Sequence, residues 1–258
     1  MAQSDIHLVR PANEDGNHTP KHFIIWLDKH IGKPDECILL KCSFFMAINP
    51  TSGLYERSLN PDDIDRSIRL EMSLIVRLDE VEFMFQAFED VEKCFHTIEK
   101  NRNKCIFFIS SGSKGRLIVP SVVANFPDTF VVEHWMYIFC ANMNMTQVKD
   151  ADPPTNTWAL QYIDHVLMFD HQDDLLARLL LDIGRYFFSE AKRLDNKEQL
   201  HSAYQHCKWS KIMYERYEKT EKRTKGAEIA AINQYMTNIE EHLNSRNDDD
   251  DAVGQSPD

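Results

Sequence analysis

The sequence predicts an α/β fold: a flavodoxin-like parallel sheet of five strands with helices on both faces, followed by a helical C-terminal extension. Three observations predict it. Five short apolar runs typical of buried parallel strands lie between residues 22 and 169. Segments with helical apolar spacing separate these runs. After the last run, the pattern is helical alone. Right-handed crossovers leave few topologies, and we expect the strand order 2-1-3-4-5.

The five apolar runs are the predicted strands. The first ends in an acid, Asp28, and the third leads directly into a loop rich in serine and glycine, residues 110–115. Such polar residues at strand ends are typical of functional or capping positions. The predicted strands cover residues 22–28, 81–85, 105–109, 135–140 and 166–169.

Helical patterns fill most of the segments between these runs. The segment 33–48 opens with a proline and acids, as the first turn of a helix does. Apolar residues at i, i+3, i+4 and i+7 predict a helix over 89–100, and a short helix is predicted over 155–162. A helix or turn after the third strand is expected to point Leu117, Ile118, Val122 and Val123 inward.

The chain divides into four parts by composition. Residues 1–20 are rich in turn formers and are predicted to be a disordered lead, and residues 21–171 form the α/β domain. Within it, residues 49–79 are predicted to be an insertion with one short helix at about 62–70. The helical extension covers residues 172–246, and the acidic residues 247–258 are predicted to be a disordered tail.

Three helices are predicted in the extension. The first, over residues 173–194, has acids at its start and the strongest apolar stripe of the chain. The second spans 197–222 and is expected to be broken by Gly226, and the third covers 228–243. The stripe of the first helix consists of Leu176, Leu179, Leu180, Ile183, Phe187 and Ala191.

Composition limits the classes of function. The chain has 258 residues and a formal net charge of -12, which disfavours binding to nucleic acid or to an anionic membrane. No apolar run approaches the roughly 18–20 residues that span a bilayer, and residues 1–21 lack the apolar core of a signal peptide. Two of the six cysteines lie in apolar strand runs, which favours reduced, buried thiols. We therefore expect a cytoplasmic protein.

The turns after the first and third strands form the candidate binding cleft, because ligands of open α/β sheets bind at the carboxyl ends of the strands. Backbone N–H groups and a serine hydroxyl suit a small anionic ligand. In the alternative interpretation, the glycines only permit a tight turn and the serines cap the next helix. The candidate residues are Asp28, Lys29, Ser110, Ser111, Gly112, Ser113 and Lys114, with His30 and Arg116 beside them.

Several familiar sites are missing from the sequence. A phosphoacceptor receiver needs an acid pair after the first strand, an aspartate after the third and a lysine after the fifth. The chain has Asp28 alone, then Ser110, then Asp170-His171. P-loop and G-x-S-x-G spacings are absent. No C-x-x-C occurs, and Cys94 and His96 diverge on a helix, so no metal and no cofactor are predicted.

Four motifs, in this order along the chain, resemble an uncharacterised α/β module of large invertebrate proteins. They are Phe23–Asp28, Cys105–Gly112, Tyr137–Cys140 and Asp173–Arg178, and the resemblance covers roughly residues 22–220. That module often precedes tetratricopeptide repeats or ADP-ribosyltransferase domains. The resemblance implies a receiver- or TIR-like regulatory domain without known catalysis. It supplies no active-site residues for this chain.

Two hypotheses of function follow. The first is a non-catalytic signalling or scaffold module that binds a small anionic ligand in its cleft or a protein partner through its helices. The basic stretch 211–223 of the extension is the candidate docking face, with a solvated surface as the alternative. The second hypothesis is a TIR-like enzyme that hydrolyses NAD or a related nucleotide. It requires a catalytic glutamate, and the candidates are Glu80, Glu82, Glu89 and Glu133.

Overall fold

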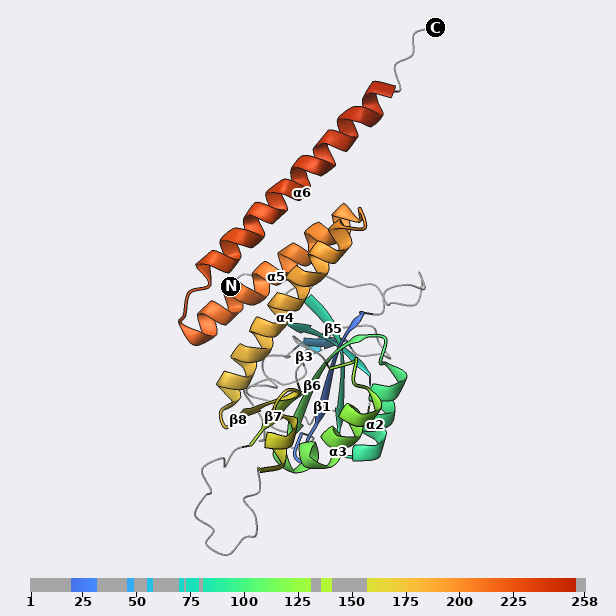
Figure 1. Ribbon diagram of the computed structural model, residues 1–258, viewed down its shortest axis with the longest axis vertical. Coiled ribbons are helices and arrows are strands. Elements are labelled where there is room, and N and C mark those ends of the chain that lie inside the picture. Colours follow the sequence, from blue (N-terminus) through green and yellow to red (C-terminus); the bar gives the residue numbers. More distant parts are fainter. Residues whose placement is uncertain are drawn as a thin grey trace, which may run out of the picture. The chain divides into compact units, whose positions relative to one another are not determined.

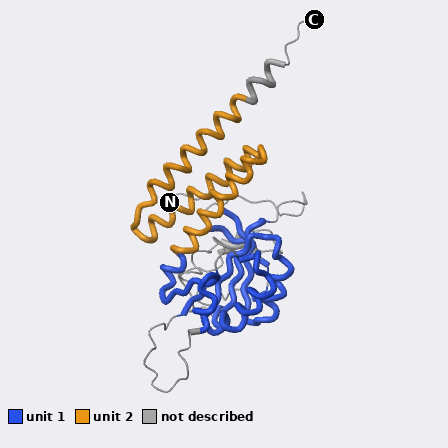
Figure 2. The backbone as a smooth tube through the Cα atoms, viewed as in Figure 1, with its two compact units in different colours: residues 1–176 blue, residues 177–258 orange. Residues whose placement is uncertain are grey.

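The computed structural model describes residues 20–31, 46–48, 55–57, 70–71, 73–78, 81–130, 136–140 and 157–253 (Figure 1). The chain forms two compact units, residues 1–176 and 177–258 (Figure 2). The division falls inside helix α4 (Gln172–Asp195), slightly later than the boundary at residue 172 that the sequence predicts. The lead over residues 1–19 lies outside the described residues.

Unit 1 contains a mixed sheet, which has eight strands within the described part of the chain, in the order β3-β2-β4-β5-β1-β6-β7-β8. The strands from β5 to β8 in this order run parallel. Numbered along the chain among themselves, they follow the order 2-1-3-4-5, so the predicted order and the α/β class are confirmed. The parallel strands are β1 (His22–Leu27), β5 (Val81–Phe88), β6 (Cys105–Ser111), β7 (Met136–Phe139) and β8 (Val166–Phe169).

The predicted strand count of five is wrong, because the sheet continues beyond β5 with antiparallel strands. They are β4 (Leu74–Leu78), β2 (Met46–Ile48) and β3 (Tyr55–Arg57). Strand β2 occupies the end of the helix predicted over 33–48, and β3 and β4 lie in the predicted insertion. Strands of three residues are too short to show the alternation that identifies a strand in a sequence. The remainder of the helix predicted over 33–48, residues 33–45, lies outside the described residues. Residues 62–69 of the short helix predicted within the insertion also lie outside them.

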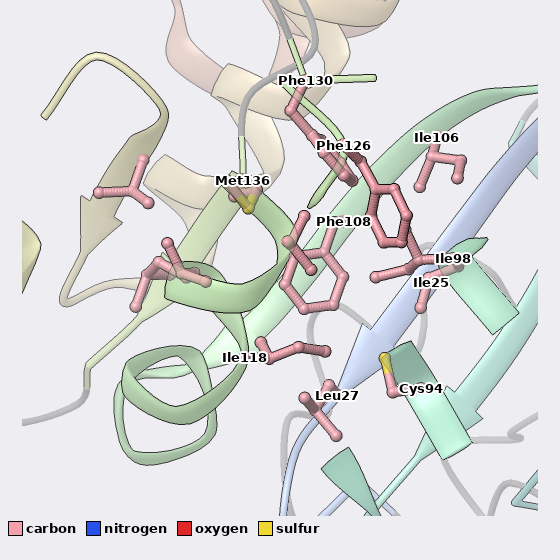
Figure 3. Close-up of a cluster of buried hydrophobic side chains, with 14 of the residues drawn as sticks. Ile25, Leu27, Cys94, Ile98, Ile106, Phe108, Ile118, Phe126, Phe130 and Met136 are labelled. Atoms are coloured by element: carbon pink, nitrogen blue, oxygen red, sulfur yellow. The ribbon is translucent and has the colours of Figure 1, made fainter. Parts of the chain in front are cut away.

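Helices α2 (Val91–Lys100) and α3 (Gly112–Asn125) cover one face of the parallel strands. The Asp90 side chain caps α2 by accepting a hydrogen bond from the Lys93 N–H at 2.9 Å. The 3-10 helix η1 (Thr157–Tyr162) packs beside α3. Figure 3 shows the buried cluster between strands and helices, which includes Ile25, Leu27, Cys94, Ile98, Ile106, Phe108, Ile118, Phe126, Phe130 and Met136.

The register of α3 corrects one predicted core residue. Leu117 is 60% exposed, whereas Ile118, Val119 and Val122 are buried. The helix begins at Gly112, directly after β6, and this start turns Leu117 away from the strands. Expecting both neighbours 117 and 118 to point inward was wrong, because adjacent helical residues diverge by about 100°.

The second face of the central parallel strands is also buried. Ile24, Phe83, Phe107 and Tyr137 are inaccessible to solvent, and Trp26 is nearly so. Burial on both faces explains why the strands appear in the sequence as continuous apolar runs instead of alternating ones. The described residues place helices on the α2–α3 face, and helices on this second face stay a prediction.

Unit 2 contains most of α4, together with α5 (Leu200–Glu221) and α6 (Gly226–Val253). Every residue of the predicted α4 stripe is buried. Helices α4 and α5 approach closely at Gly184, where an added Cβ would lie 3.3 Å from the Tyr214 ring. The Ser210 hydroxyl donates a hydrogen bond to the Gly184 carbonyl at 2.7 Å. The absence of a side chain at Gly184 therefore brings the two helices together.

Helix α6 differs from its prediction at both ends. The break before it comes at Lys222, which has the left-handed φ of 53°, and Gly226 is the first residue of α6. The helix continues to Val253, so predicting disorder for residues 247–253 was wrong, and residues 254–258 lie outside the described chain. An acidic composition disfavours a new helix, but extending an existing one costs little per residue.

Replacing Leu180 with alanine tests the packing of α4. Leu180 is fully buried, so Leu180→Ala is expected to lower the free energy of unfolding by about 2–5 kcal/mol. Chemical denaturation measures the change. Leu117→Ala is the matched control, because Leu117 is also helical but 60% exposed, and it is expected to cost under about 0.5 kcal/mol. Equal effects of the two substitutions would contradict the burial of the α4 stripe.

Candidate functional site at the carboxyl edge of the sheet

The turns after β1 and β6 meet at one edge of the sheet. The two strands are parallel neighbours, and Leu27 pairs with Ser110. Neighbouring strands lie about 4.8 Å apart, so Asp28 lies beside Ser111, and the start of α3 at Gly112 follows directly. The predicted convergence of these two turns is therefore confirmed.

Asp28 shapes the turn after β1. Its N–H donates to the Phe88 carbonyl at 3.0 Å, which connects the turn to β5. Its buried carboxylate accepts a hydrogen bond from the His30 N–H at 2.5 Å. Lys29 is exposed between them. His30 Nδ1 is buried and has no hydrogen-bond partner among the described residues. The Asp28 carboxylate is therefore hydrogen-bonded within the turn, and the His30 Nδ1 atom is unpaired within the described chain.

The two serines after β6 have different roles. Ser110 is fully buried, and its hydroxyl donates to the Ser111 carbonyl at 3.1 Å. Ser111 occupies the N-cap position of α3, as the alternative interpretation expects, but its side chain makes no capping hydrogen bond. Within the described chain, the buried Ser111 Oγ has no hydrogen-bond partner at all. The hydroxyl at the start of α3 is therefore a buried polar atom that no described residue pairs with.

Gly112 is required by the close approach of Cys140. A Cβ at residue 112 would lie only 2.3 Å from Cys140 Sγ. The Gly112 N–H donates a hydrogen bond to this sulfur. Burial raises the pKa of the Cys140 thiol, and the hydrogen bond from Gly112 opposes that rise only in part. Cys140 is fixed in turn by its own N–H, which donates to the Phe169 carbonyl at 2.7 Å.

The first turn of α3 carries no acid. Ser113 is exposed, Lys114 is partly buried and Arg116 is exposed. The positive end of the helix dipole therefore stays uncompensated within α3, and Lys114 adds to it. Gly115 is buried against Trp158 of η1, whose ring would lie 3.3 Å from an added Cβ.

Trp158, beside α3, carries a further polar atom that is unpaired among the described residues. Its Nε1 is buried, and no hydrogen-bond acceptor in the described part of the chain reaches it. An indole N–H is only a donor, so it suits an oxygen-rich ligand. Sequence reasoning missed Trp158, because one aromatic residue in a short 3-10 helix carries no pattern. It also missed Cys140, whose position beside Gly112 depends on the pairing of β6 with β7.

The glutamates required by the hydrolase hypothesis lie in different places. Glu89 directly follows β5 at the carboxyl edge and is exposed. Glu82 lies at the other end of β5, where it pairs with Arg77 at 3.4 Å. Glu80 and Glu133 lie outside the described residues. Two of the four candidate glutamates, Glu82 and Glu89, are described. Of these two, Glu89 lies beside the turn after β1.

The described part of the chain contains neither a group of metal-ligating side chains nor a membrane-spanning helix. No group of three or more His, Cys, Asp or Glu residues is arranged there to hold a metal ion. The described helices are also too polar or too short to cross a bilayer.

Cys94 and Cys207 are buried thiols, and burial raises the pKa of Cys207 to about 11. Cys37 and Cys42 lie outside the described residues.

Comparisons of the chain with protein-family models, with curated proteins and with solved structures found no match. The geometry of the carboxyl edge is therefore the basis for an assignment of function.

The contact between Gly112 and Cys140 predicts a non-additive pair of substitutions. Gly112→Ala is expected to lower the free energy of unfolding by about 1–3 kcal/mol, because the new Cβ overlaps Cys140 Sγ. In a Cys140→Ala background the same change should cost much less, since the next atoms lie 3.7 and 3.9 Å away. Urea denaturation of the four proteins measures the cycle, and additive effects would contradict this contact.

Proposed function

We propose that this protein is a non-catalytic, receiver- or TIR-like regulatory module with a flavodoxin-like parallel core, and that the carboxyl edge of its sheet binds a small anionic ligand. One observation carries the proposal. His30, Ser111 and Trp158 each present a buried polar atom without a hydrogen-bond partner in the described chain, and all three residues lie on elements at or beside this edge. Buried polar groups are normally paired, so these atoms point to a ligand.

The chemistry of these groups favours an anion. Trp158 Nε1 is a donor, Ser111 Oγ and His30 Nδ1 can each donate, and the first turn of α3 adds backbone N–H groups. Lys114 supplies positive charge, and α3 has no acid in its first turn. Among the described residues, the buried carboxylate at this edge is that of Asp28, and it already accepts the His30 N–H. A phosphate or a phosphate-bearing small molecule is the class of ligand that fits.

The same edge gives little support to catalysis. Asp28 is engaged in its own turn, and Glu89 is exposed. Hydrolysis of NAD or a related nucleotide remains the second candidate, because Glu89 lies beside the turn after β1.

In this proposal, unit 2 binds the protein partner. Lys219, Lys222 and Arg223 are exposed at the end of α5 and in the turn after it. Such a group of cations complements an acidic protein surface and accelerates association. Binding at the edge of unit 1 would then be the regulatory input, and the helices would dock the partner.

Ligand-dependent thermal stability tests the anion site. Inorganic phosphate or AMP is expected to raise the melting temperature, since a ligand selective for the folded state stabilises it by about 2.7 kcal/mol at a concentration of 100 Kd. Trp158→Phe keeps an aromatic side chain and removes the N–H donor, and Ser111→Ala removes the hydroxyl. Each should weaken the stabilisation. Ser121→Ala is the matched control, because this exposed serine lies in a later turn of α3.

Two outcomes of this experiment would overturn the proposal. If neither phosphate nor AMP stabilises the wild-type protein, the carboxyl edge is not an anion site. If incubation with NAD releases nicotinamide and Glu89→Gln abolishes that release, the protein is an enzyme and the non-catalytic assignment is wrong.

A further inference from the structure

Lys104 lies at the amino edge of the sheet, at the opposite end of β6 from the anion site. It immediately precedes β6, and its N–H donates to the Asn101 carbonyl at 2.8 Å in the turn that follows α2. Phe23 of β1 pairs with Ile106 of β6 on one side and with Met84 of β5 on the other. The Lys104 side chain runs across these neighbouring strands.

The Lys104 amine rests on an apolar surface. Its Nζ lies 2.7 Å from Met84 Sδ and 5.7 Å from the centre of the Phe23 ring. A thioether is a weak acceptor, and an aromatic face is a weak partner for a cation compared with a carboxylate. No carboxylate of the described chain forms an ion pair with Lys104, and the charged residues nearest to it in sequence, Arg102 and Lys100, are basic.

Lys93, on the neighbouring helix α2, has the opposite environment. Its Nζ binds both carboxylate oxygens of Glu71, at 2.7 and 2.8 Å. This hydrogen bond raises the pKa of Lys93, whereas burial lowers the pKa of Lys104. The neutral amine, which is the nucleophile, is therefore more populated at Lys104 than at Lys93 at any pH below both values.

We propose that Lys104 is a site of covalent acylation by activated acyl compounds, such as acyl phosphates or acyl thioesters. The lone pair of the neutral Nζ attacks the acyl carbon, and a C–N bond forms. The bond from that carbon to the phosphate oxygen or to the thiol sulfur breaks, and the phosphate or thiolate leaves with its electron pair. The amine proton passes to water or to the leaving group. No oxidant or reductant takes part, and the product is an uncharged amide.

The apolar contacts of Lys104 with Met84 and Phe23 favour the neutral amide. An ammonium group on Met84 and Phe23 lacks a counter-charge, so its conversion to a neutral amide removes an unpaired cation from a partly buried position. Lys93 would lose its carboxylate partner in the same reaction. The two lysines therefore differ in reactivity and in the cost of modification, and both differences favour Lys104.

The test is acetylation of the full chain by acetyl phosphate at about pH 8, with peptide mass spectrometry to follow each lysine. Lys104 is expected to react at least about threefold faster than Lys93, although the Lys93 side chain is 59% exposed. A rate that simply follows exposure, with Lys93 ahead of Lys104, would overturn the proposal.

Two substitutions at Met84 test whether the missing counter-charge, and not the accessibility of Lys104, determines its acetylation rate. Met84→Glu places a carboxylate beside Nζ and is expected to reduce the Lys104 rate to about the Lys93 level. Met84→Leu keeps the apolar contact and is the matched control, expected to leave the rate within about twofold of wild type. Melting curves verify that both variants fold. Equal Lys104 rates in the Glu and Leu variants would contradict the proposed role of the missing counter-charge.

Discussion

The pairing of β1 with β5 on one side and with β6 on the other is the constraint on which unit 1 depends. Both backbone edges of β1 are occupied by parallel neighbours, and both of its faces are buried. Parallel pairing fixes direction as well as position, so the carboxyl ends of these strands must lie at one edge. The backbone positions of Asp28 and Ser111 are therefore adjacent because of this register, whether or not their side chains touch.

Burial of both faces also explains where the polar chemistry of unit 1 lies. A polar side chain in the middle of such a strand would need a buried partner, and the strand interiors are almost entirely apolar. Most polar groups therefore lie at the ends of the strands, and the partly buried Gln86 inside β5 donates to the Glu71 carbonyl. Donors gather at the carboxyl edge around the start of α3, and Lys104 lies at the amino edge. The two proposed sites are separated by the length of β6.

The sequence predicted the parts of the fold that carry long or repeated signals. Continuous apolar runs identified the five parallel strands, and the stripe from Leu176 to Ala191 identified α4. Strands β2 and β3 were missed because each has three residues and takes its place by pairing with a neighbour. The predicted end of α5 at residue 222 is confirmed within one residue, but the break was assigned to Gly226, whereas Lys222 adopts a left-handed conformation that lysine seldom takes. Ser111 and Gly112 were found from the loop composition, whereas Trp158 and Cys140 depend on contacts between segments distant in the sequence.

Asp28 shows why a correct position does not by itself give a correct role. The sequence places an acid at the end of the first strand, where such folds often use acids to hold a cation or to take part in chemistry. In the structure its carboxylate accepts the His30 N–H, and its backbone binds β5. With this charge engaged in the turn, the groups left at the edge are an imidazole nitrogen, a hydroxyl, an indole N–H and the start of a helix. The exposed Glu89 lies at the same edge, and the hydrogen-bond donors of this set are the reason for proposing an anionic ligand.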